Sequence, residues 1–141
     1  MLVGHDVDVV AILDGDEPGR KEGKRLVQKL LSGDDRRCLF VGDYTTSKDG
    51  ELEDLFPEDF YLKAVKTAYP SVELKLSTQE KGLSGTINKV DALFARKGIS
   101  FEKWKAAAVL RDDTLAAPSS VPPETLDAAE QIFITVNALF P

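Results

Sequence analysis

The acidic segment Asp14–Asp16 (DGD) constrains the fold more than any other part of the sequence. It directly follows Val7–Leu13 (VDVVAIL), a short and nearly continuous apolar run that is rich in β-branched residues. Such a run is typical of a strand covered on both faces, as in a parallel sheet. Pro18 then favours the first turn of a helix. The pattern predicts a buried strand that ends in an acidic loop and leads into a helix.

The residues that follow predict a layered α/β fold. Leu26, Val27, Leu30 and Leu31 lie on one side of the predicted helix, which ends at Ser32–Asp35. The segment 37–41 reads as a second buried strand, so the order is strand, helix, strand. A short connection of this kind gives parallel strands. Residues 72–76 alternate between apolar and charged side chains and predict a third strand.

The rest of the chain predicts helices. A helical stretch runs from Glu51 to about Ala68 and is interrupted at Pro57, and further helices are expected at 85–96 and 101–111. We expect residues 1–115 to form the main domain. Residues 116–141 would then be a connector and a C-terminal helix packed on that domain. The apolar residues predicted to face the core from this last helix are Leu126, Ala129, Phe133, Val136 and Phe140.

Composition limits the classes of function. With 141 residues, 43% hydrophobic and 30% charged, the chain is long enough for one domain with a core. It has neither an apolar run of roughly 20 residues nor a signal peptide at its start, so we expect a cytoplasmic protein without a membrane partner. The single cysteine, Cys38, lies in an apolar run and is expected to be buried and inert. The net charge of −6 disfavours unaided binding to phosphate backbones.

Asp14 and Asp16 are the first candidates for chemistry. Alternate side chains of an extended segment point to the same side, so the two carboxylates can converge on one point. Like charges at close range raise a pKa or require a cation, and Mg²⁺ binds carboxylate oxygens at about 2.0–2.1 Å. Gly15 and Gly19 leave room for a ligand near the backbone. We therefore predict a site for Mg²⁺ or Mn²⁺; the alternative is that both aspartates only cap the helix and solvate the turn.

Two segments resemble a known family. The segment VVAILDGDEPGRKEGKRL resembles the Asp-x-Asp motif of the TOPRIM domain, which is shared by bacterial primases, topoisomerases and nucleases of the OLD (overcoming lysogenization defect) family. The segment 51–57 (ELEDLFP) looks like the Glu-Asp-Leu segment of OLD-type TOPRIM domains. The likeness is strong over the first third of the chain and weak beyond Ala68. It implies a three-layer, Rossmann-like α/β domain with a small, mostly parallel sheet and extra C-terminal helices.

The resemblance also implies a function, namely Mg²⁺-dependent hydrolysis of phosphodiester bonds in DNA by two metal ions about 3.5–4 Å apart. In this family Asp14 and Asp16 would hold metal, and Glu53, together with Glu51, would hold a second ion. OLD nucleases use a late lysine followed four residues on by alanine, which matches Lys103 here, with Lys105 as the second choice. Such a lysine would stabilise charge on the phosphate or position water; otherwise it is a solvated lysine on a helix.

The chain also departs from the family pattern. TOPRIM nucleases carry a glutamate on a strand before the Asp-x-Asp strand, and none precedes Val7 here. Glu51 stands where a small hydroxylated residue is expected. OLD proteins usually begin with an ATPase domain, so we expect an upstream ATPase domain or a partner chain to complete the site. The alternative function is a non-catalytic or truncated TOPRIM-like module that binds a metal or a partner.

Basic residues and the last helix give two further expectations. Arg20, Lys21 and Arg25 lie on the polar face of the first predicted helix and are candidates for contacts with DNA phosphates. The alternative is that they are only the solvated face of an amphipathic helix. The C-terminal helix is expected to pack in the core, with a homodimer contact as its alternative.

Overall fold

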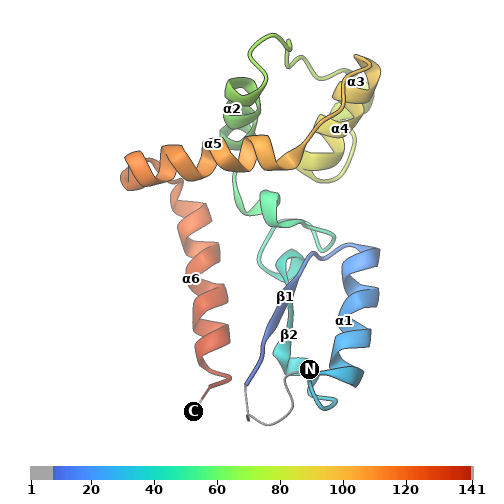
Figure 1. The fold of residues 1–141 in the computed structure, drawn as a ribbon, viewed down its shortest axis with the longest axis vertical. Helices are drawn as coiled ribbons and strands as arrows, with labels where there is room; N and C mark the ends of the chain where they lie inside the picture. Colours follow the sequence, from blue (N-terminus) through green and yellow to red (C-terminus); the bar gives the residue numbers. More distant parts are fainter. Residues whose placement is uncertain (1–7, 141) are drawn as a thin grey trace.

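The computed structural model describes residues 8–140, in which a two-stranded parallel sheet with α1 beside it lies at one end and the helices α2 to α5 lie at the other (Figure 1). The helices and strands have the following bounds: β1 Ala11–Leu13, α1 Glu17–Lys29, β2 Cys38–Phe40, α2 Glu58–Ala68, α3 Thr78–Lys81, α4 Thr86–Arg96, α5 Lys103–Ala116 and α6 Pro123–Asn137. Single 3₁₀ turns lie between them: η1 Asp35–Arg37, η2 Val41–Asp43, η3 Leu52–Leu55 and η4 Pro118–Ser120. This is a mixed, mainly helical architecture compatible with the α/β class.

The predicted strand–helix–strand unit is confirmed. β1 and β2 pair in parallel, with Ala11 opposite Cys38 and Leu13 opposite Phe40, and α1 packs against both strands. The strands are shorter than predicted, since β1 begins at Ala11, and Val7 lies outside the described residues. The prediction that the first strand is covered on both faces is wrong, because Ile12 is 45% exposed.

The main hydrophobic core lies among the helices and not at the sheet. Tyr61 and Val65 of α2 pack with Leu93 and Phe94 of α4, and all four side chains are buried. The ring of Phe94 also meets Tyr69 edge-on, with the ring centroids 4.8 Å apart. Burying a side chain of this size contributes about 1.5–3 kcal/mol, so the helices provide most of the hydrophobic stabilisation.

The predicted third strand at residues 72–76 is wrong. Val72 is buried, and the following apolar side chains pack against the helical core, so the segment is extended without pairing to a strand. Side chains take up its backbone carbonyls instead: Lys66 Nζ donates to Val72 O at 2.9 Å, and Arg96 donates to Lys75 O at 3.0 Å. The alternating pattern of residues 72–76 therefore arises because one side of the segment faces the helices, and not because the segment is a strand of a sheet.

The prediction that the apolar face of the last helix packs in the core is also wrong. Leu126 is 52% exposed and Phe133 is 69% exposed, whereas Thr125 and Ile132 are the buried residues of α6. The buried side of the helix is therefore that of Thr125 and Ile132, and α6 packs against η3. Figure 1 shows α6 extending away from α5 as a separate limb of the molecule.

The structure bears on two further predictions, one about membrane-spanning helices and one about Cys38. Within residues 8–140, no helix is both long enough and apolar enough to cross a membrane. Cys38 is buried, as predicted, and burial raises the pKa of its thiol, which disfavours the reactive thiolate.

An ion pair between the buried Glu80 and the half-exposed Arg96 joins α3 to α4 and gives a pH-dependent prediction. Hydrogen bonds from Arg96 and from the Ser77 backbone lower the pKa of Glu80 from 4.5 to about 2. Because the unfolded chain keeps the ordinary pKa, ionised Glu80 stabilises the fold above pH 4.5, and this contribution is lost as the pH falls towards 2. Glu80→Gln should therefore lower the unfolding free energy at neutral pH, with a deficit that shrinks across that range. Urea unfolding at several pH values measures this, and a pH-independent deficit would contradict it.

Candidate functional site

The loop that follows β1 is held against a second loop, residues 42–50, by close backbone contact. The Gly15 amide donates to Gly50 O at 2.8 Å. A Cβ on Gly15 would lie 2.2 Å from Lys48 O, and a Cβ on Gly42 would lie 2.0 Å from the same oxygen. No side chain fits at either position. The two glycines therefore let the two loops pack closely, and this packing places residues 51–53 near the end of β1.

The turn η3 is fastened to both halves of the molecule. On one side, the Leu52 amide donates to Asp14 Oδ1 at 3.1 Å. On the other, Asp54 Oδ1 accepts from the Thr86 amide at 2.8 Å and so caps the start of α4. Glu51 begins the turn, and its amide is bound by Asp54. This places Glu51 and Glu53 beside Asp14.

Lys103, the first residue of α5, lies at the same place. Its ammonium group forms an ion pair with Glu51, and Nζ is 3.8 Å from Glu53 Oε1. We call Asp14, Glu51, Glu53 and Lys103 the acidic cluster. Four residues that the family resemblance marked for metal binding and catalysis, from three separate segments, are thus brought together.

The charges of this cluster act on one another. Burial raises the pKa of Glu53, and the nearby carboxylates of Glu51 and Asp14 raise it further, while Lys103 opposes the rise. Burial alone would lower the pKa of Lys103, but its hydrogen bond to Glu51 and the charges of Glu53, Glu51 and Asp14 leave that pKa raised. The ammonium is therefore held in its charged form as the counter-ion of the three carboxylates.

Asp16 has a different role in this structure. Its Oδ1 accepts from the Gly19 amide at 2.8 Å, which makes Asp16 the N-cap of α1. Asp14 instead binds the Leu52 amide, so the two aspartates have separate hydrogen-bond partners. Across residues 8–140, no three His, Cys, Asp or Glu side chains are grouped so as to hold a metal ion.

The other candidate residues lie outside the cluster. Arg20 donates to Lys48 O at 2.8 Å and lies over the Phe40 ring, so it supports the loop packing. Arg25 pairs with Glu22 on the surface of α1, where Lys21 is exposed. Lys105 pairs with Glu102 and lies over Tyr69. Of the two candidate lysines, Lys103 is therefore the one that contacts the acids of the cluster.

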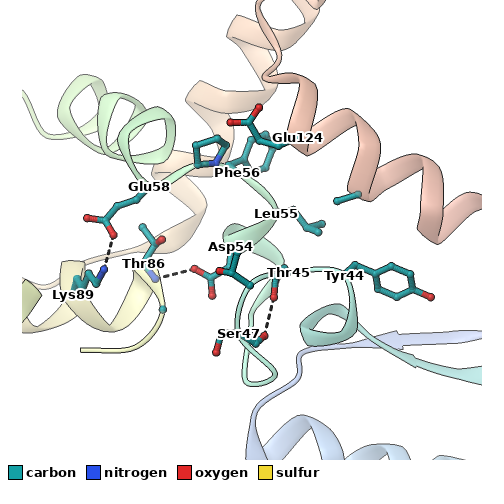
Figure 2. A pocket seen from close by; sticks show the side chains of 14 residues that line it. Tyr44, Thr45, Ser47, Asp54, Leu55, Phe56, Glu58, Thr86, Lys89 and Glu124 are labelled. Atoms are coloured by element: carbon teal, nitrogen blue, oxygen red, sulfur yellow. Dashed lines mark hydrogen bonds and ion pairs between the residues drawn. The ribbon is translucent and has the colours of Figure 1, made fainter. Parts of the chain in front are cut away.

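Sequence reasoning missed the structural role of Asp54 in the Glu-Asp-Leu segment. Figure 2 shows Asp54 bonded to the Thr86 amide at the edge of a cavity of about 430 Å³. Lys89 and Glu58 form an ion pair in the same cavity, and Thr45 and Ser47 line it from the second loop. The signal available in the sequence was Gly85–Thr86, which starts α4. Gly85 has no side chain that could cap the helix, so the Thr86 backbone amide is capped by Asp54 from a distant segment.

No family model, curated protein or solved structure matches this chain. The acidic cluster is therefore described by its own residues and contacts alone.

The close loop packing predicts a large effect of a small substitution. Gly15→Ala should destabilise the protein by about 1–3 kcal/mol, because its methyl group would overlap Lys48 O and force the loops apart. Gly82→Ala is the matched control, since a Cβ there meets only ordinary contacts at 3.4 Å or more. Chemical denaturation of the two variants compares them directly, and equal stabilities would show that the loops are not packed as described.

The position of Lys103 predicts a stability effect that Lys105 does not share. Lys103→Met leaves three neighbouring carboxylates without their counter-ion, so we expect a loss of about 1–2 kcal/mol at neutral pH. Lys105→Met removes the surface pair with Glu102 and the contact of the ammonium with the Tyr69 ring, and should cost less than about 1 kcal/mol. Thermal and urea unfolding in metal-free buffer measure both. Equal losses would mean that Lys103 is an ordinary surface lysine.

Proposed function

We propose that the chain is a Mg²⁺-dependent nuclease domain of the TOPRIM type, close to the OLD family, which hydrolyses phosphodiester bonds in DNA. The observation that carries this proposal is the convergence of Asp14, the Glu51–Glu53 turn and Lys103. These residues come from three separate segments, and Lys103 lies among the acids as their counter-ion. The family resemblance assigns these residues to the site together with Asp16, which lies outside the cluster.

The donor chemistry of the cluster fits a hard divalent cation. Its potential ligands are carboxylate oxygens, which Mg²⁺ and Mn²⁺ prefer. Burial, and after it the charges of Glu51 and Asp14, raise the pKa of Glu53, and a bound cation would favour its ionised form. The described side chains are not grouped as metal ligands, so for a metal to bind, Asp14, Glu51 and Glu53 would have to turn towards one another, and Asp16 would add Oδ2, since its helix cap uses Oδ1. The metal would supply an activated water and neutralise charge on the phosphate.

The protein's own groups have defined tasks in this proposal. Lys103 holds a positive charge beside the acids, where it stabilises negative charge that develops on a phosphate. The net charge of −6 means that DNA approaches only where cations reverse the local field, and Lys21 and Arg25 on α1 would add to that attraction. An upstream ATPase domain, a partner chain or a second copy would complete the nuclease.

A second function is favoured by other observations on the same cluster. The Lys103–Glu51 ion pair already compensates part of the negative charge, and Asp16 is engaged as a helix cap. Both fit a non-catalytic TOPRIM-like module that binds a metal or a partner without cutting nucleic acid. The two functions share the cluster and differ in whether a bond is broken.

Metal binding and cleavage are tested together. Titration calorimetry with Mg²⁺ should show binding that Asp14→Asn and Glu53→Gln each weaken at least about tenfold, and both variants should lose nicking of supercoiled plasmid in Mg²⁺ or Mn²⁺. Asp127→Asn, an exposed acid on α6, is the control that should change neither.

The possible outcomes separate the two functions. Binding of Mg²⁺ without cleavage of any nucleic acid would support the non-catalytic module. Nicking that persists unchanged in Asp14→Asn and Glu53→Gln would point to a contaminating nuclease and remove the proposal.

A further inference from the structure

The outward side of α6 is apolar. Leu126, Phe133 and Ile134 are 52%, 69% and 54% exposed, and their spacing of seven and eight residues places them on one face of the helix. We call these three side chains the α6 patch. Among the described residues, η3 is the one element against which α6 packs extensively, and Figure 1 shows the helix leaving α5 as a separate limb. Large apolar side chains gathered on one exposed face are unfavourable in water, so the patch is a candidate interaction surface.

The charge of α6 is entirely negative. Residues 123–137 contain Glu124, Asp127 and Glu130 but no lysine or arginine. Within residues 8–140, none of these three carboxylates takes part in an ion pair. Glu130 stands four residues from both Leu126 and Ile134, so it lies within the α6 patch. The patch therefore joins apolar surface to negative charge that the described part of the chain leaves uncompensated.

A hollow beside α6 adds to this negative charge. It measures about 590 Å³, lies between η2 and α6, and is lined by Asp43, Glu124 and Asp127, with no lysine or arginine among its described lining residues. Asp127 precedes Ile134 by seven residues and so lies next to the α6 patch. The acids thus extend from the patch to the hollow, where a long basic side chain of a partner can reach them.

The chemistry of the α6 patch discriminates among possible occupants. A second copy of α6 would bring acids against acids, which is unfavourable, and DNA or an anionic membrane surface would be repelled in the same way. A helix whose apolar stripe is flanked by lysine or arginine suits both properties of the patch, since its stripe covers the apolar side chains and its bases pair with the acids. The seven-residue spacing of Leu126 and Phe133 is that of contact positions in paired helices.

We propose that the α6 patch docks a basic amphipathic helix of a partner protein. The apolar side chains of the patch supply the buried centre of the contact, and Glu130 and Asp127 select the partner by charge. The inference goes beyond the proposed function, because it uses no residue of the acidic cluster and holds whether or not a metal binds there.

The test uses a designed peptide as the probe. Fluorescence anisotropy measures the binding of a labelled helical peptide of about three heptads, with leucine along one face and lysine at the flanking positions. One comparison peptide carries glutamate in place of lysine, and a scrambled peptide has the composition of the first but leucines spread around the helix. The lysine peptide should bind at least about tenfold more tightly than either, and its affinity should fall as NaCl rises from about 50 to about 500 mM.

Substitutions at exposed positions locate the contact on α6. Phe133→Asp should weaken binding of the lysine peptide at least about tenfold, whereas Trp104→Asp, which places the same charge at a 64% exposed side chain of α5, should not. Glu130→Lys should weaken binding of the lysine peptide and strengthen that of the glutamate peptide. Asp91→Lys makes the same change of net charge at an exposed site of α4 and should leave the order of the peptides unchanged. Circular dichroism checks that each variant is folded.

Three results would overturn the proposal. Equal binding of the lysine peptide and the scrambled peptide would mean attraction by charge alone, and binding of none of the peptides would remove the docking surface. Dimers in sedimentation that Phe133→Asp dissociates would show that a second copy covers the α6 patch. None of these results bears on Mg²⁺ binding or cleavage at the acidic cluster, so the proposed function stands or falls separately.

Discussion

The turn η3 is the junction on which the structure depends. Its backbone binds Asp14 at the end of β1, its Asp54 caps α4, its first acid pairs with α5, and α6 packs against it. Among the described residues, none of the element pairs with extensive contact joins β1, β2 or α1 directly to α2, α4 or α5. A short 3₁₀ turn thus connects two parts that have separate interiors, and the acidic cluster is located where they meet.

Local patterns in the sequence predicted the elements that depend on local physics. The apolar run before Asp14, the proline at the start of α1 and the break at Pro57 each depend on neighbouring residues, and the structure has a strand, a helix start and an interruption at these places. The predicted burial of the strand on both faces was wrong. The predictions for residues 72–76 and for the face of α6 failed because periodicity shows that a segment has two sides, but not what covers either side. In the structure, residues 72–76 pack on the helical core and form no strand pairing, whereas α6 packs on η3.

The candidate site was predicted in part. Residue types and spacing singled out Asp14 and Asp16, and the family resemblance added Glu51, Glu53 and Lys103. The structure brings Asp14, Glu51, Glu53 and Lys103 together and gives Asp16 a helix to cap. After a strand, an aspartate that caps a helix and an aspartate that binds metal look the same in the sequence. They differ in the backbone amides that surround them, and only the three-dimensional structure shows where those amides lie. The same holds for Asp54, whose partner is 32 residues away.

The acidic cluster spans the η3 junction, and this has a consequence for cooperativity. Asp14 belongs to the strand–helix–strand unit, whereas Lys103 starts a helix of the main core. Any ion or substrate held by both sides would act as a cross-link between them and would be bound more weakly whenever the junction loosens. Affinity at this place therefore depends on the mechanical coupling of the two units as much as on the acids themselves, and occupancy would in turn stiffen the whole molecule.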